Sequence, residues 1–152
     1  MLRKKKVILL FIVLLGFLIR VFGITDFPPS LNWDEVSHGY NAYSILKTGR
    51  DEWGHLLPLT NFRAYGDYPL PANLYLTIPS IALFGLNEFG IRFPHALLGT
   101  AIILSTYFLV LGLKFGNKVA ILAALFVAID PWTFFSSRSV LQANVAVFFL
   151  IT

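Results

Sequence analysis

The chain has 152 residues, of which 57% are hydrophobic and only 13% are charged. This composition is too apolar for an ordinary soluble domain, so we expect an integral membrane protein. The net charge of +4 does not indicate nucleic-acid binding, because four of the twelve basic residues lie at positions 3–6, before an apolar run. Such a cluster favours a cytoplasmic N-terminus. The absence of cysteine excludes disulfides and thiolate metal sites.

The first predicted element is a membrane span at residues 7–24. A helix of this length would measure about 27 Å, close to the thickness of the hydrocarbon core. The sequence Phe22-Gly23-Ile24-Thr25 has no small-x-small cleavage site, so we interpret the segment as an uncleaved span rather than a signal peptide. We expect Arg20, near the end of the run, to extend towards the outer headgroups.

Residues 25–91 are expected to form a long extracytoplasmic loop, which contains most of the acidic residues. Within it, residues 34–47 predict a helix with a partial apolar face, capped by Asp34 and ended by Thr48-Gly49. We expect this helix to lie on the membrane rather than to cross it. The apolar segment 72–86 is short and contains Pro79, so it predicts either a span or an interfacial helix.

Three further apolar runs predict spans at residues 92–113, 119–135 and 141–152. Lys114 and Lys118 flank the turn after the first of these runs, and the positive-inside rule places that turn in the cytoplasm. The parity of crossings then favours an interfacial position for residues 72–86. The last run covers only about 18 Å before it stops, so we expect the sequence to be the N-terminal part of a longer membrane protein.

The adjacent carboxylates Asp34 and Glu35 are the most informative feature of the predicted outer loop. Like charges side by side raise each other's pKa, so such a pair needs a reason to be at a membrane surface. A general base, a metal ligand or an acceptor for sugar hydroxyl groups would each supply one. The alternative is the solvated start of a helix, with Asp at the N-cap and Glu in the first turn.

The predicted topology brings three stretches to the outer face. They combine carboxylates and aromatic rings, which suit sugar binding, with arginines, which suit a phosphate group. Each candidate also has a simpler interpretation: a histidine at the surface, an arginine at the membrane boundary, or a belt tryptophan at the interface. The first stretch contains Trp33, Asp34, Glu35 and His38; the second contains Trp53, His55, Asp67 and Tyr68; the third contains Asp130, Trp132 and Arg138.

These motifs, taken together, resemble the dolichyl-phosphate-mannose–protein mannosyltransferase family and its relatives, the lipid A aminoarabinose transferases. The resemblance covers nearly the whole chain and keeps order and spacing. It is carried by Trp33-Asp34-Glu35, Tyr40-x-x-Tyr43-Ser44-Ile45-Leu46-Lys47-Thr48-Gly49, Asp51-Glu52-x-Gly54-x-x-Leu57-Pro58-Leu59, Phe84-Gly85-Leu86-Asn87-Glu88-Phe89-x-x-Arg92-x-Pro94 and Asp130-Pro131-Trp132 with Ser137-Arg138.

The resemblance implies an all-α integral membrane protein with a GT-C-type multi-span helical bundle. It implies transfer of a sugar, with inversion, from a polyprenyl phosphate to an extracytoplasmic glycan, lipid or protein, in the plasma membrane of a prokaryote. Asp34 would be the general base, assisted by Glu35, and Arg92 and Arg138 would contact the lipid phosphate. Trp33, His38, Asp67 and Tyr68 complete the predicted substrate site. The resemblance implies no certain cofactor, and the carboxylates leave room for a divalent metal ion.

Two positions differ from the pattern of these relatives. Tyr68-Pro69-Leu70-Pro71 stands where relatives often have Tyr-Lys-Pro-Pro, and Gln142 stands where they often have an acidic residue.

The competing hypothesis is a non-enzymatic membrane subunit or part of a transporter. A transporter would be expected to place charges or broken helices at the middle of the bilayer, whereas here the charges gather in the predicted outer loop. We expect the 152-residue chain alone to lack transferase activity.

Overall fold

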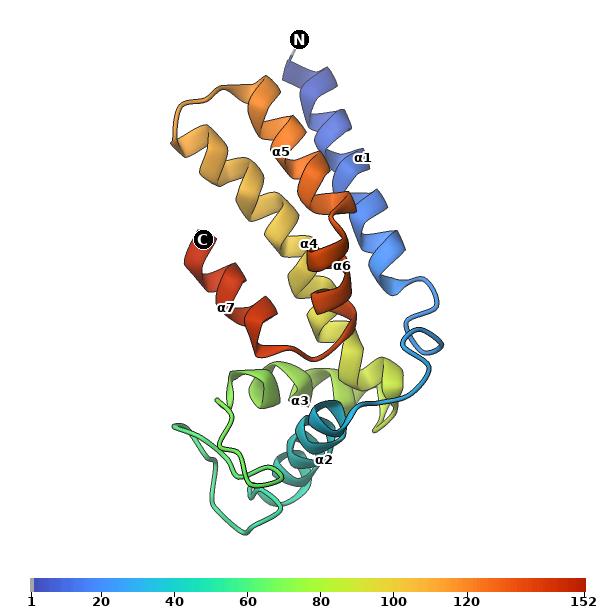
Figure 1. Cartoon of the computed structure of the whole chain (residues 1–152), viewed down its shortest axis with the longest axis vertical. Helices are drawn as coiled ribbons and strands as arrows, with labels where there is room; N and C mark the ends of the chain where they lie inside the picture. Colours follow the sequence, from blue (N-terminus) through green and yellow to red (C-terminus); the bar gives the residue numbers. More distant parts are fainter. Residues whose placement is uncertain (1) are drawn as a thin grey trace. The chain divides into compact units, whose positions relative to one another are not determined.

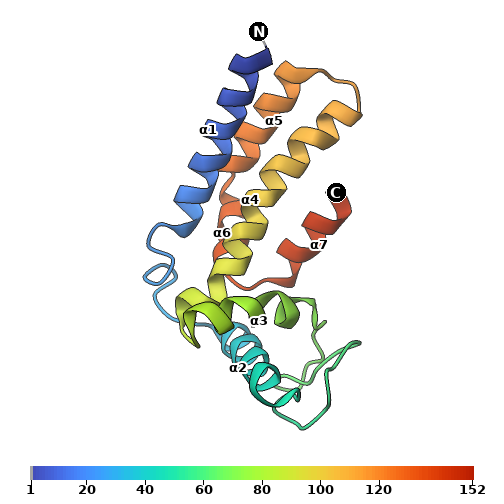
Figure 2. The ribbon, with the colours of Figure 1, turned by 180° about the vertical axis from the view of Figure 1, so that it is seen from behind.

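The computed structural model describes residues 2–152 and consists of helices joined by turns and loops (Figures 1 and 2). Within the described residues there are seven helices, and the only β-pairing is two isolated bridges. The helices are α1 (Leu2–Val21), α2 (Trp33–Thr48), α3 (Ala72–Phe84), α4 (Glu88–Gly112), α5 (Asn117–Ile129), α6 (Pro131–Arg138) and α7 (Gln142–Ile151).

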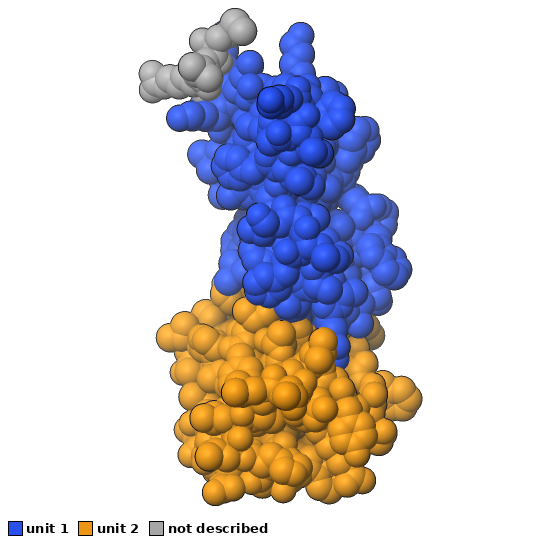
Figure 3. Space-filling model, turned by 90° about the vertical axis from the view of Figure 1, so that its left-hand side faces the viewer, with its two compact units in different colours: residues 1–22, 95–152 blue, residues 23–94 orange. Residues whose placement is uncertain are grey.

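The chain divides into two compact units, coloured separately in Figure 3. Unit 1 contains residues 1–22 and 95–152, and unit 2 contains residues 23–94. Helix α4 contributes its first seven residues to unit 2 and the remainder to unit 1, with Pro94 at the boundary. Each unit has its own hydrophobic core.

The core of unit 1 depends on close packing between α1 and α5, which run side by side in Figures 1 and 2. Ala120, Ala124 and Ala128 follow one another at intervals of four residues on α5, and all three are fully buried. Small side chains on one helix face let two backbones approach closely. They pack with Ile12 of α1 and Ile103 of α4 in one hydrophobic cluster.

The predicted third span, residues 119–135, is broken in the structure. Asp130 adopts an extended conformation with φ −63° and ψ 125°, and α5 and α6 meet at an angle of 53°. Pro131 has no N–H group, so it cannot make the helical hydrogen bond to Val127, and it favours the first position of a new helix. Asp130 Oδ2 accepts the N–H of Thr133 at 2.7 Å and caps α6. The predicted third span therefore corresponds to two helices joined at a bend, and its crossing of the membrane stays a prediction.

Arg20 supplies the donors that the break removes. Its Nη2 donates to the carbonyl oxygen of Val127 at 3.1 Å, and its Nη1 donates to that of Ala128 at 2.9 Å. The side chain is 0% exposed. The prediction that Arg20 extends towards the headgroups was wrong. The guanidinium is buried instead, because it provides hydrogen-bond donors to two carbonyl groups at the end of α5 that the break leaves without backbone donors.

Arg138 makes the reciprocal contact from α6 to the end of α1. Its Nη1 donates to the carbonyl oxygens of Ile19 at 3.1 Å and Phe22 at 2.7 Å. These carbonyl groups belong to the last turn of α1 and the residue after it, where intrahelical partners run out. The two arginines therefore join α1, α5 and α6 through helix ends, and this part of unit 1 is bound by hydrogen bonds as well as by apolar packing.

The other predicted spans also differ in length from the structure. Helix α1 begins at Leu2, just before the basic cluster, and ends at Val21, three residues before the predicted boundary. Helix α7 has ten residues. Among the described residues, α4 is the one helix that is long and apolar enough to cross a membrane by itself, and the bent pair of α5 and α6 would be a second if it counts as one span. The four-span arrangement stays a prediction.

We expect Arg20→Leu to destabilise unit 1. The substitution keeps an apolar helix but leaves the carbonyl groups of Val127 and Ala128 without this donor, at a cost of about 1–3 kcal/mol for each group that stays unsatisfied. Leu18→Ala, at a side chain that is 61% exposed on the same helix, is the matched control and should change stability much less. Thermal unfolding of the purified protein in detergent measures both, and equal midpoints would contradict the role given to Arg20.

Candidate functional site

Unit 2 contains all but one of the residues that the sequence predicts for the site. Its core is formed by Ile45, Phe62, Ala64 and Leu74, which join α2, α3 and the loop between them. Helix α2 starts with a capping box: Asn32 Oδ1 accepts the N–H of Glu35, and Glu35 Oε2 accepts the N–H of Asn32, both at 2.9 Å. The cap is therefore Asn32 rather than the predicted Asp34, which lies at the second helical position.

Glu35 is buried in an ion pair with Arg92 of α4. Arg92 Nε donates to Glu35 Oε1 at 2.7 Å, and Nη2 donates to Oε2 at 3.1 Å. The side chains are 1% and 0% exposed. The remaining N–H groups of Arg92 donate to the carbonyl oxygens of Ile24, Pro28 and Ser30 at 2.7–2.9 Å. Since a guanidinium has five donors, every donor of Arg92 is used inside unit 2.

Asp34, in contrast, points its carboxylate to the solvent. The side chain is exposed, and no hydrogen bond or ion pair of this carboxylate occurs within the described part of the chain. Its backbone is held, because its peptide group lies in the first turn of a capped helix. Two adjacent acids thus have different environments. The carboxylate of Glu35 is fixed and neutralised by Arg92, whereas the backbone of Asp34 is held and its carboxylate has no partner within the described residues.

His38 lies one helical turn after Asp34 and is 2% exposed. Its Nδ1 bonds the backbone oxygen of Asp34 at 2.6 Å, so this nitrogen carries the proton. The ring meets Phe62 edge to face, with 5.2 Å between centroids, and Nε2 has no hydrogen-bond partner among the described residues. Burial lowers the pKa of His38 below its ordinary value, and this outweighs the opposing effect of Asp34.

Trp33, Asp67 and Tyr68 are all exposed in unit 2. Trp33 is the first residue of α2 and is 73% exposed. Asp67 lies in a tight turn, where its Oδ1 accepts the N–H of Tyr68 at 2.8 Å. Tyr68 is 61% exposed. These side chains are accessible to a ligand, and their predicted roles in substrate binding stay predictions.

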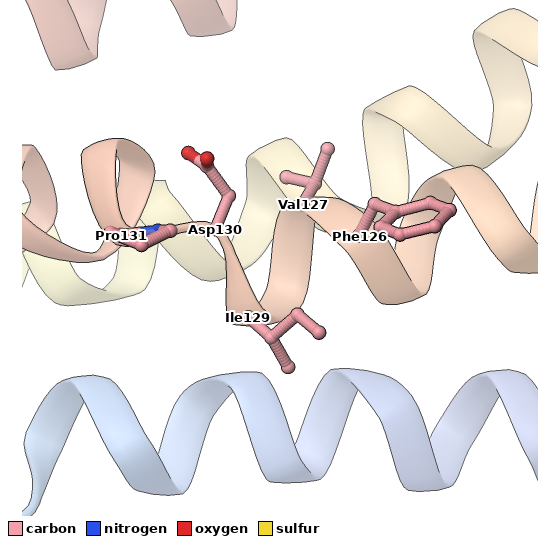
Figure 4. A pocket seen from close by; sticks show the side chains of 5 residues that line it. All are labelled: Phe126, Val127, Ile129, Asp130 and Pro131. Carbon is pink, nitrogen blue, oxygen red and sulfur yellow. The ribbon is translucent and has the colours of Figure 1, made fainter.

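Arg138 and Asp130 belong to unit 1, so their predicted convergence with the residues of unit 2 stays a prediction. Figure 4 shows Asp130 in an open pocket of about 450 Å³ whose other lining residues are apolar, namely Phe126, Val127, Ile129 and Pro131. A different pocket, of about 310 Å³, lies in unit 2 between α2 and the start of α4. Val36 and Tyr40 line that pocket, whereas Asp34 does not.

Metal binding has no ready set of ligands in the structure. Within residues 2–152, no group of three or more His, Asp or Glu side chains is placed to hold a metal ion. Glu35 is committed to Arg92, which leaves Asp34 as a single accessible carboxylate at the start of α2. The residues present therefore do not form a preassembled divalent cation site.

A comparison with known protein families identifies the class of protein. The family described as dolichyl-phosphate-mannose-protein mannosyltransferase matches residues 10–152. The chain belongs to this family. Its members are membrane-embedded glycosyltransferases that use a polyprenyl-phosphate sugar donor, so the resemblance seen in the sequence is confirmed. No curated protein and no solved structure matches the chain.

Sequence reasoning missed the cap and the role of Arg92. The spacing of Asn32 and Glu35, with an acid three residues after a capping residue, is a recognisable capping-box signal. The partnership of Glu35 and Arg92, 57 residues apart, leaves no such signal in one sequence, because it depends on how α4 packs on α2.

We expect Arg92→Leu to destabilise unit 2 by about 3–5 kcal/mol, because it leaves the buried carboxylate of Glu35 without its cation. The double variant Arg92→Leu with Glu35→Leu should recover part of this loss, since no buried charge then remains. Chemical unfolding of both variants and of Glu35→Leu alone completes a double-mutant cycle. Additive effects would show that the two side chains do not interact.

We expect unit 2 to lose stability as the pH falls below about 6.5. The folded pKa of His38 is lowered from its ordinary value of 6.5, so the unfolded chain binds more protons in this range and protonation favours unfolding. Well above pH 6.5 His38 is neutral in both the folded and the unfolded chain, so its contribution to the stability of unit 2 is fully present. His38→Gln should flatten this part of the stability profile when unfolding is compared at intervals between pH 5 and pH 8. An unchanged slope would show that His38 is not the group responsible.

Proposed function

We propose that this protein transfers a sugar, with inversion, from a polyprenyl phosphate to a hydroxyl group of an extracytoplasmic glycan, lipid or protein, and that Asp34 is the general base. The family supports the reaction class and the donor class. The choice of Asp34 rests on one observation: it is an exposed carboxylate without a protein partner, held next to a carboxylate that is fully engaged.

The reaction needs few chemical groups from the protein. The acceptor oxygen attacks the anomeric carbon, the bond from that carbon to the phosphate oxygen breaks, and the polyprenyl phosphate leaves with the bonding electrons. The proton of the acceptor hydroxyl goes to the carboxylate of Asp34. Because phosphate is a good leaving group, the protein mainly has to position the reactants and accept this proton.

Glu35 and Arg92 serve this proposal as positioning residues. Glu35 joins the cap of α2 to Arg92, and Arg92 joins the loop carbonyls of residues 24, 28 and 30 to α4. Together they fix the start of the helix on which Asp34 lies. A lipid phosphate would reach Arg92 only by displacing one of these acceptors, so the predicted phosphate contact of Arg92 requires a rearrangement of unit 2.

We also assign His38 a positioning role, because its side chain is already engaged inside unit 2. Its ring is enclosed and bonded to the backbone of Asp34, so direct contact with a substrate would require the ring to leave its position. Trp33 is better placed for a sugar, because its ring is exposed and aromatic faces pack against the apolar faces of sugar rings.

We expect Asp34→Asn to lower turnover by about 10²–10⁴-fold, the usual contribution of a general base. Asn has nearly the same shape and cannot take the proton. Because Asn32 provides the cap, the substitution should leave the fold intact. Transfer of radiolabelled sugar from polyprenyl-phosphate donors to acceptor in proteoliposomes of the full-length protein measures the effect.

Asp26→Asn is the matched control, since Asp26 is another exposed acid of unit 2. It should keep the wild-type rate. Wild-type turnover in Asp34→Asn would exclude Asp34 as the base, and unfolding of Asp34→Asn would indicate a structural role instead.

A further inference from the structure

The loop between α2 and α3 is fixed to α2 by side-chain hydrogen bonds. Asn41 Nδ2 donates to Glu52 Oε1 at 2.9 Å, and the N–H of Glu52 donates to Asn41 Oδ1 at 3.0 Å. Asp51 Oδ1 accepts the N–H groups of Trp53 at 3.0 Å and His55 at 2.8 Å. The backbone on both sides of Trp53 is therefore held, and the fold sets the direction of the indole.

A short hairpin follows in the same loop. Phe62 N–H donates to the carbonyl oxygen of Pro69 at 3.2 Å, and Ala64 and Asp67 exchange backbone hydrogen bonds at 2.9 and 2.8 Å. The two residues of the turn, Tyr65 and Gly66, both have positive φ, as a two-residue hairpin of this kind requires.

The two faces of the hairpin differ. Phe62 and Ala64 are 1% and 5% exposed and pack into the core of unit 2. Since side chains alternate along a strand, Arg63 lies on the outer face, and the pairing places Tyr68 opposite it. The inner face thus anchors the hairpin, and the outer face presents a guanidinium beside a phenol.

Arg63 also stacks on Trp53. The guanidinium carbon lies 4.4 Å from the centre of the indole ring, and Trp53 Nε1 donates to the carbonyl oxygen of Arg63 at 3.0 Å. Within the part of the chain that the structure describes, the guanidinium makes no hydrogen bond and no ion pair. The stack holds it in place and leaves all five N–H groups available to an acceptor.

Large apolar side chains are exposed throughout this loop. Exposed groups at such density indicate a contact surface rather than a water-facing loop. We call the following set the loop surface: Trp53 at 50% exposure, Leu56 at 64%, Leu57 at 48%, Leu59 at 80%, Tyr65 at 69%, Tyr68 at 61% and Leu70 at 61%. The acids nearby already have partners, because Glu52 bonds Asn41 and Asp67 bonds the backbone of Tyr68.

We propose that the loop surface docks on phospholipid headgroups of the membrane in which this protein is embedded. Its leucines would enter the boundary of the acyl chains, its tryptophan and tyrosines would lie at headgroup level, and Arg63 would donate to lipid phosphates. Leucine, aromatic rings and arginine together are typical of interfacial segments, and a guanidinium matches the geometry of a phosphate. A sugar acceptor explains the aromatic rings but not four exposed leucines.

The test uses the fluorescence of Trp53 in liposomes. Trp33→Phe and Trp132→Phe leave Trp53 as the one tryptophan of the chain, which has three. Phosphatidylcholine brominated near the carboxyl end of the acyl chain should quench Trp53 strongly, whereas aqueous iodide should quench it weakly. Adding Leu59→Ser should shift the emission to the red and reduce quenching by the brominated lipid. The matched control Leu83→Ser, at a side chain that is 78% exposed on α3, should not.

Three results would overturn the proposal. Quenching by iodide but not by brominated lipid would show that the loop surface faces water. Protection from both quenchers would show that protein covers it. Protection that occurs only after addition of polyprenyl phosphate would assign the surface to the donor. The proposal does not depend on Asp34: loss of activity in Asp34→Asn and failure of the lipid quenching are separate outcomes.

Discussion

In both units a buried arginine donates to backbone carbonyl oxygens that lack a backbone donor, and the rest of the structure depends on these contacts. Arg20 satisfies the end of α5, where Pro131 cannot, and Arg92 satisfies three carbonyl groups of the loop before α2. Away from water an unpaired carbonyl group is costly. A guanidinium suits this task because it has five donors in one plane.

The same constraint explains how unit 2 separates the roles of two adjacent acids. A guanidinium buried among carbonyl groups needs a counter-charge, and Glu35 provides it from the first turn of α2. Glu35 and Arg92 are therefore paired with each other, and Asp34 is the acid whose carboxylate is exposed. The like charges of the pair are therefore tolerated, because one of them is neutralised inside the protein. The exposed position of Asp34 next to a paired acid is therefore a consequence of the contact between Glu35 and Arg92.

The sequence predicted the elements better than it predicted their contacts. Gly49 ends α2 as expected, with φ 70°, and the predicted helices at 34–47 and 72–86 correspond to α2 and α3. Hydrophobic periodicity and capping residues are local, so they can be read from one sequence. The burial of Arg20 and Arg92 could not, because a boundary arginine and a buried arginine look the same in sequence and differ only in whether a distant carbonyl group lacks a donor. The sequence shows the proline at position 131, but it does not show the angle between α5 and α6.

The two arginine networks also limit where a lipid phosphate can be recognised. Arg92 has no donor to spare, and Arg138 donates to the end of α1, so phosphate binding at either position would remove donors from carbonyl groups of the fold. Arg63 is different: it is held against Trp53 by stacking, and its donors face outwards. A cation fixed by an aromatic ring rather than by hydrogen bonds can bind a phosphate without any loss to the fold. The guanidinium groups of Arg20, Arg92 and Arg138, which hydrogen-bond the fold, therefore differ from that of Arg63, which is held by stacking and is available to a phosphate.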